Sequence, residues 1–82
     1  MDRKQTELIL KESMVHIGNK IKKEREDRGW DQLEVVIRSG VSQSVIYNLE
    51  IGVADNITMK SLIGLSAAFE IDIISLIRCT SQ

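Results

Sequence analysis

The sequence predicts an all-α fold, a small bundle of five helices. Three observations support this prediction. The 82 residues include no proline, which would interrupt a helix. Apolar residues recur three or four positions apart, and no stretch of useful length alternates between apolar and polar as a strand would. Gly40 and Gly52 follow two such stretches, where a glycine ends a helix in the left-handed conformation.

The first helix is predicted from about Ser13 to Arg28, with Gly29 as its stop. The face that it buries is expected to comprise Val15, Ile17 and Ile21. Before it, three consecutive apolar residues lie among charges, and we expect either a short extra helix or a flexible arm there. The predicted division is an N-terminal extension over residues 1–12, a domain over residues 13–79 and a C-terminal tail over residues 80–82.

Capping residues place the second and third helices. Asp31 occupies an N-cap position with Glu34 three residues later, as in a capping box, so a helix is predicted over residues 32–39. Ser42 caps the third helix, which is expected to end near Ile51. The second helix carries more apolar residues than one buried face needs, namely Leu33, Val35, Val36 and Ile37.

The last two helices are placed in the same way. Thr58 caps a fourth helix that ends near Phe69 and whose buried residues are expected to include Leu62 and Leu65. Asp72 caps a short fifth helix that ends at about Arg78. This last helix is too apolar to remain in water, so it contacts either a second copy of the chain or the core. Its apolar residues are Ile73, Ile74, Leu76 and Ile77.

Composition excludes several classes of function. The net charge is −1, from 11 basic and 12 acidic residues, so any affinity for DNA must come from local placement of charge. One cysteine, Cys79, and one histidine, His16, make no disulfide and no metal site, and we expect no cofactor. No activated nucleophile or phosphate-binding glycine loop is visible, so we do not expect an enzyme. Without a signal peptide or a bilayer-length apolar run, the chain is expected to be cytoplasmic, with no membrane and no evident small-molecule ligand.

The most informative stretch runs from Gly40 to Glu50. Val45, Ile46 and Leu49 form the inner stripe of the third helix, which leaves the polar residues between them to point outward. The outward residues are Gln43, Ser44, Tyr47 and Asn48. Glutamine and asparagine amides donate and accept at once, which matches adenine in the major groove. Solvated helix surface is the alternative interpretation of the same pattern.

The pattern as a whole resembles the Cro/C1-type, or lambda-repressor-like, helix-turn-helix domains. The resemblance covers about residues 17–77, and it depends on the joint spacing of its parts. The residues that carry it are Ile17-Gly18, Ile21, Arg25, Gly29-Trp30, Asp31-Gln32, Gly40-Val41-Ser42, Ile46, Leu49-Glu50, Gly52, Asn56-Ile57-Thr58 and Leu62.

The resemblance implies a set of DNA-contacting residues. It makes Gln32 a phosphate contact, at a helix amino end where backbone N–H groups also favour an anion. It makes Gln43, Ser44 and Asn48 the base readers at the front of the third helix. Tyr47 lies between them, where a DNA contact and a protein contact are both open. The implied partner is double-stranded DNA.

The resemblance also implies a structural ion pair and an assembly. Arg25 on the first helix and Glu50 late in the third occupy the positions of a pair found in this family. A sequence-specific transcriptional regulator would bind a palindromic operator as a homodimer, with Ile73, Ile74 and Ile77 at the dimer interface. Small phage repressors and controllers of restriction-modification systems are regulators of this size.

Departures from the family pattern support a second hypothesis. The loop after the third helix, Val53-Ala54-Asp55, is not basic, and the third helix contains no lysine or arginine. Lys20, Lys22 and Lys23 are either a solvated helix face or a contact with the DNA backbone. The second hypothesis is a protein-interaction module, such as an antitoxin-like or anti-repressor partner, with weak or no DNA binding.

Overall fold

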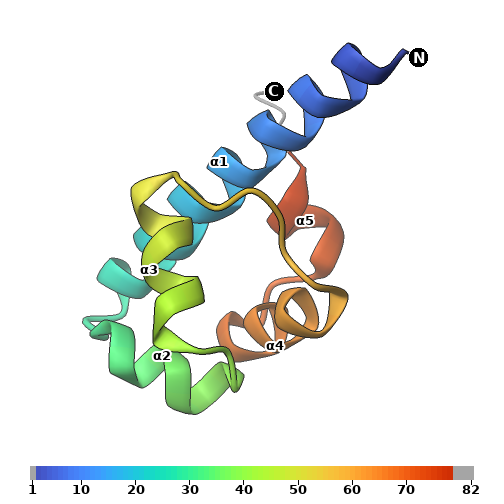
Figure 1. The fold of residues 1–82 in the computed structure, drawn as a ribbon. Helices are drawn as coiled ribbons and strands as arrows, with labels where there is room; N and C mark the ends of the chain where they lie inside the picture. Colours follow the sequence, from blue (N-terminus) through green and yellow to red (C-terminus); the bar gives the residue numbers. More distant parts are fainter. Residues whose placement is uncertain (1, 79–82) are drawn as a thin grey trace.

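The structure, a computed structural model, describes residues 2–78, and these form five α-helices and no strand. The helices are α1 (Arg3–Asp27), α2 (Gln32–Ser39), α3 (Gln43–Ile51), α4 (Met59–Phe69) and α5 (Ile73–Ile77), as Figure 1 shows. The prediction of an all-α, five-helix fold is confirmed. The expectations for Cys79 and for the tail over residues 80–82 lie outside the described residues.

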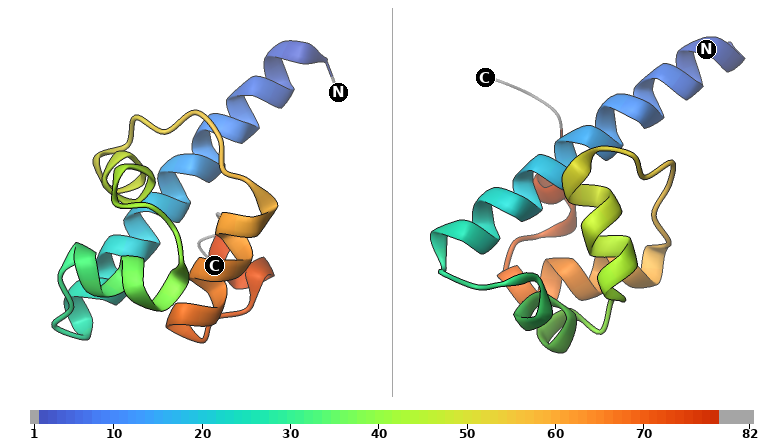
Figure 2. Two further views of the ribbon diagram at one scale, coloured as in Figure 1. Left: turned by 60° about the horizontal axis from the view of Figure 1, so that its bottom comes forward. Right: turned by 60° about the vertical axis from the view of Figure 1, so that its left-hand side comes forward.

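The start of the first helix was predicted wrongly. α1 begins at Arg3 rather than near Ser13, so residues 3–12 are neither a separate helix nor a flexible arm. Asp2 caps α1: its carboxylate accepts from the Gln5 backbone at 2.9 Å, and the Gln5 side chain accepts from the Asp2 backbone at 3.1 Å. With this capping box and no glycine or proline before Gly18, nothing interrupts the helix. Its N-terminal part extends beyond the other helices (Figure 1, Figure 2).

The buried face of α1 also differs from the prediction at one position. Val15 was expected inside but is 39% exposed, whereas Met14 is buried. The buried residues Met14, Ile17, Gly18 and Ile21 follow the spacing of three and four that keeps side chains on one helix face. Val15 lies one residue off this spacing, so it points away from the bundle.

The core lies where α1 packs against α3, α4 and α5, and where α2 packs against α3 and α4. α1 crosses α3 at Gly18, where a Cβ atom would overlap the carbonyl oxygen of Leu49. The close approach of these two helices therefore requires a glycine. The buried apolar residues are Met14, Ile17, Ile21, Val35, Val41, Ile46, Leu49, Leu62, Leu65, Phe69 and Leu76.

Trp30 closes the bundle at the turn between α1 and α2. It folds back onto the core, where its ring stacks on Phe69 with the centroids 5.4 Å apart. The Arg28 guanidinium lies over both rings and donates to the Phe69 backbone oxygen at 2.9 Å. This contact joins the end of α1 to the end of α4.

The predicted caps are present. The side chains of Asp31, Ser42, Thr58 and Asp72 each accept from the backbone N–H three residues later. Gly40 and Gly52 end α2 and α3 in the left-handed conformation, with φ of 74° and 83°. The capping box expected at α2 is incomplete, because the Glu34 carboxylate pairs with Arg38 at 2.7 Å instead of returning to the cap.

Candidate nucleic-acid interface

The turn between α2 and α3 is braced by two serine hydroxyls. The Ser39 hydroxyl donates to the Val35 oxygen at 2.6 Å and accepts from the Val41 N–H at 3.1 Å. The Ser42 hydroxyl caps α3 by accepting from Val45 N–H at 3.3 Å. Val41 is itself buried, so the turn is anchored in the core. These contacts set the angle at which α3 leaves the turn.

α3 presents one face to the core and one to solvent. Ile46 and Leu49 are buried, with Val45 partly buried beside them. The structure places all four predicted outward residues on the other face, where Asn48 is half-buried and the rest are exposed: Gln43, Ser44, Tyr47 and Asn48. Within residues 2–78, no hydrogen bond or ion pair engages their side chains. Their donors and acceptors are therefore available to a partner.

Two apolar residues extend this outward face beyond what the sequence reasoning identified. Ile51 is 51% exposed and Val53 is 60% exposed. Ile51 follows Tyr47 by four residues, as Tyr47 follows Gln43, so the three share one stripe of α3. That spacing was the signal that could have revealed Ile51. In a major groove, apolar side chains contact the methyl group of thymine.

Gln32, the predicted phosphate contact, is partly engaged inside the protein. Its side-chain nitrogen donates to a Glu50 carboxylate oxygen at 3.2 Å. The Asp31 carboxylate caps the same end of α2 by accepting from Glu34 N–H at 2.8 Å. A negative side chain therefore lies where backbone N–H groups would favour a phosphate. Gln32 keeps a second amide hydrogen and its oxygen for an outside partner.

Arg25 and Glu50 form the ion pair that the sequence suggested. Arg25 Nε donates to Glu50 Oε2 at 2.8 Å and Nη2 donates to Oε1 at 2.9 Å, while Nη1 donates to the Trp30 oxygen at 2.9 Å. The two side chains are only 15% and 4% exposed. The hydrogen bonds that Arg25 donates to Glu50 raise the pKa of Arg25 above its already high ordinary value, so the guanidinium stays charged. This pair locks α1, α3 and the start of α2 together.

A comparison with known families matches a helix-turn-helix model to residues 21–76, more than half of the chain. The chain belongs to the Cro/C1-type helix-turn-helix family. This family is a DNA-binding regulatory domain and is not typically enzymatic. Searches of curated proteins and of solved structures found no match.

The helix-turn-helix surface carries little positive charge. Residues 43–57, which comprise α3 and the following loop, contain no lysine or arginine, and Asp55 in that loop is exposed. At the start of α4, Lys60 is exposed. Arg38 on α2 lies over the Trp30 ring at 4.2 Å. Electrostatic attraction to a phosphate backbone is correspondingly weak.

The three lysines at positions 20, 22 and 23 of α1 divide into paired and unpaired residues. Lys20 pairs with Glu24 at 3.2 Å, and Lys23 pairs with Asp27 at 2.9 Å, which raises the pKa of Lys23. Lys22 is exposed and forms no ion pair within the described residues. Of the three, Lys22 is therefore the one with its charge free for a phosphate.

The predicted dimer residues of the helix-turn-helix chain differ in exposure. Ile74 is 66% exposed, whereas Ile73 and Ile77 pack partly against the core. Leu76, between them, is fully buried. α5 thus offers one prominent apolar side chain on its outer face.

Residues 2–78 contain neither a metal-binding cluster nor a membrane-spanning helix. In that part of the chain, no group of three or more histidine, cysteine, aspartate or glutamate side chains is arranged to hold a metal ion. None of the helices described there has the length and apolar character required to span a bilayer.

Proposed function

We propose that this chain is a sequence-specific transcriptional repressor that binds a palindromic operator as a homodimer in the cytoplasm. One observation carries the proposal. The outward face of α3 presents unengaged amide and hydroxyl groups on a helix held rigidly by the Arg25–Glu50 pair and the α2–α3 turn. Rigid presentation favours base reading, because flexible side chains lose entropy on binding.

The proposed roles follow from the chemistry of each side chain. Gln43 and Asn48 each make a bidentate contact with an adenine edge in the major groove. Ser44 donates or accepts at a neighbouring base, and Tyr47 contacts a base, sugar or phosphate beside it. Gln32 and the amino end of α2 position the backbone, with the free amide hydrogen of Gln32 donating to a phosphate.

The proposed homodimer aligns two α3 helices with successive major grooves. Ile74, with Ile73 and Ile77 beside it, supplies the contact between the two copies. In helix-turn-helix dimers, the half-sites lie about 34 Å apart, one turn of the duplex. Two half-sites double the number of base contacts, which offsets the low positive charge of each copy.

The test is selection of bound duplexes from a random pool, followed by titration of the selected duplex at several salt concentrations. We expect a site with two-fold symmetry and a shallow salt dependence, because few phosphates are neutralised. Gln43→Ala and Asn48→Ala should each weaken binding by about 5- to 150-fold, the equivalent of about 1–3 kcal/mol per bidentate contact. Asn19→Ala, an exposed amide on α1, is the matched control and should leave binding unchanged.

Two results would overturn the proposal. One is the absence of saturable binding to any duplex at low salt. The other is equal loss of affinity in Asn48→Ala and in the Asn19→Ala control, which would show that no base is read.

The second candidate function is a protein-interaction module, antitoxin-like or anti-repressor. It is favoured by Leu33 and Ile37, which lie one turn apart on α2 and are 56% and 70% exposed. Apolar side chains in such a pair are unfavourable in water unless a partner covers them. Ile37→Ser should then abolish binding to the partner while leaving duplex binding unchanged.

A further inference from the structure

Two lysines near the start of α1 lie on the side of that helix that faces α3. Residues seven positions apart on a helix share a side, with a drift of only about 20° at each step. Gly18 meets the backbone of α3, and Arg25, seven residues later, is ion-paired with α3 as well, so this row of α1 faces α3. Lys11 and Lys4 are the two preceding members of the same row. They therefore lie on the α3 side of α1, on the N-terminal side of the place where the two helices cross.

The ammonium groups of Lys4 and Lys11 are unpaired in the structure. Both side chains are exposed, and within residues 2–78 neither forms an ion pair or a hydrogen bond. Lys4 lies in the first turn of α1, where the helix dipole disfavours a positive charge and where the turn itself contains no acidic residue. A bound anion would remove that unfavourable interaction.

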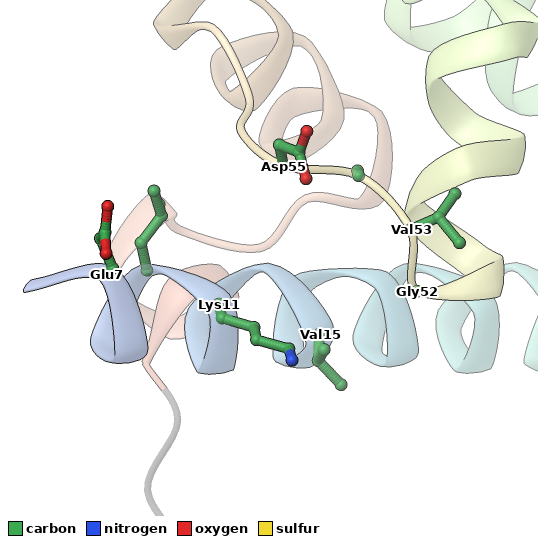
Figure 3. A pocket seen from close by; sticks show the side chains of 8 residues that line it. Glu7, Lys11, Val15, Gly52, Val53 and Asp55 are labelled. Carbon is green, nitrogen blue, oxygen red and sulfur yellow. The ribbon is translucent and has the colours of Figure 1, made fainter. Parts of the chain in front are cut away.

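Lys11 lies beside the loop that follows α3. A groove of about 470 Å³ separates α1 from this loop, and Lys11 and Val15 line it together with residues 52–55 (Figure 3). Glu7 and Asp55 also line the groove, but Figure 3 shows the Lys11 side chain directed away from both carboxylates. The Lys11 ammonium is therefore open to an anionic group that approaches from the α3 side.

A duplex bound by α3 would bring phosphates to this place. The major groove is about 12 Å wide, so the two DNA backbones run close beside a helix that lies in it. The loop that leaves the carboxyl end of α3 then comes close to a backbone, yet residues 52–57 contain no lysine or arginine. Lys11 lies beside that loop, and Lys4 follows about 10.5 Å further along α1. These two lysines are placed to carry the positive charge that the loop lacks.

We propose that Lys4 and Lys11 bind phosphates of the duplex beside the α3–α4 loop. This inference rests on the proposed function, since it requires α3 to lie in a major groove. Both lysines precede residues 21–76, which align with the family model, so the contact is an addition that this chain makes to its helix-turn-helix. Phosphate contacts position a protein but carry no sequence information, so the lysines strengthen binding to every duplex and leave the choice of sequence to α3.

The experiment compares the full chain with a double variant, Lys4→Gln with Lys11→Gln, on the selected duplex and on an unrelated one at several salt concentrations. The slope of the logarithm of the binding constant against that of salt should fall by about 0.9 for each lysine in each copy. Affinity at low salt should fall at least about tenfold, and by the same factor for both duplexes. Lys4→Arg with Lys11→Arg keeps both charges and should keep the affinity.

Lys20→Gln with Lys23→Gln is the matched control. It removes the same charge from the same helix, but at 100° per residue both lysines lie on the opposite side of α1 from Gly18. Both also pair with acidic residues of α1. The control should keep the affinity and the salt slope of the native chain, and circular dichroism should show equal helix content in all variants.

Two outcomes overturn this inference and leave the proposed function standing. In one, the native chain binds the selected duplex and the Lys4→Gln, Lys11→Gln variant binds it with the same affinity and salt slope. In the other, the control loses as much affinity as that variant. A variant that binds DNA normally but no longer self-associates would assign the two lysines to a contact between copies, and would also overturn the inference. If the native chain binds no duplex at low salt, the proposed function fails and this inference fails with it.

Discussion

The two halves of α1 share one helix but not one environment. From Met14 to Asp27 the helix packs on α3, α4 and α5 and contributes Arg25 to the largely buried Arg25–Glu50 pair. From Arg3 to Glu12 it touches no other helix closely enough to bury a residue. Leu10 continues the stripe of Met14, Ile17 and Ile21 by one turn, yet it is 46% exposed.

This difference separates the causes of helix formation from the causes of packing. Residues 3–12 are helical because a capping box starts the helix and good helix formers continue it. Isolated helices of this length are marginal in water, so continuity with the packed half supplies the remaining stability. Burial requires a second surface, which the fold provides to only one half.

The largest expected effect comes from breaking the ion pair of the packed half. Arg25→Ala leaves the Glu50 carboxylate, 4% exposed, without its charged partner and should cost about 3–5 kcal/mol of unfolding free energy. The double variant Arg25→Met with Glu50→Leu should cost less, because no charge is left buried. Urea denaturation measures both. A double variant less stable than Arg25→Ala would contradict this account.

A pair of alanine substitutions compares the two halves directly. Met14→Ala removes a side chain that is 4% exposed and should cost about 2–4 kcal/mol. Leu10→Ala removes the next residue on the same stripe and should cost less than about 1 kcal/mol in a monomer, because that side chain is half-exposed. Denaturation at low protein concentration tests this. Equal costs would mean that Leu10 is covered in solution.

Gly18→Ala tests the contact that positions the packed half. The added Cβ would overlap the Leu49 carbonyl oxygen, so α1 and α3 must move apart. We expect a loss of about 2 kcal/mol, despite the better helix propensity of alanine. Asn19→Ala is the exposed neighbour for comparison, and its thermal unfolding midpoint should change little. A stabilised Gly18→Ala variant would show that the helices are not held at this distance.

The smallest effect concerns pH. The hydrogen bond from Arg28 lowers the pKa of Glu24 below its ordinary value of 4.5. The charged form is therefore favoured by folding, so its contribution is complete above about pH 5 and is lost as the pH falls through the folded pKa. Glu24→Gln should be less stable than the native chain by under about 1 kcal/mol at neutral pH. The difference in stability between the native chain and Glu24→Gln should shrink as the pH falls, and thermal unfolding at several pH values measures it. A difference that grew in acid would contradict the lowered pKa of Glu24.

Much of this fold was readable from local chemistry. Four helix starts could be predicted from their N-cap residues, Asp31, Ser42, Thr58 and Asp72. Two helix ends could be predicted from Gly40 and Gly52. Caps can be predicted in this way because they depend on neighbouring backbone groups alone. The outward placement of Gln43, Tyr47 and Asn48 followed from helical periodicity. The exposure of Ile51 followed from the same periodicity, but sequence reasoning treated that residue only as a helix end.

Other features depended on groups distant in the chain. The engagement of Gln32 by Glu50 joins residues 18 apart. The choice of Met14 over Val15 as a core residue depends on the angle at which α1 meets its neighbours.

Local signals along the chain were thus sufficient for helix identity, for the caps and for which α3 residues face outward. They were not sufficient for which helical residues become buried. Helix formation depends on hydrogen bonds and rotamers within a few residues, whereas burial depends on what the rest of the chain brings to each face. α1 shows both rules in one element, since it is helical throughout and buried in only one half.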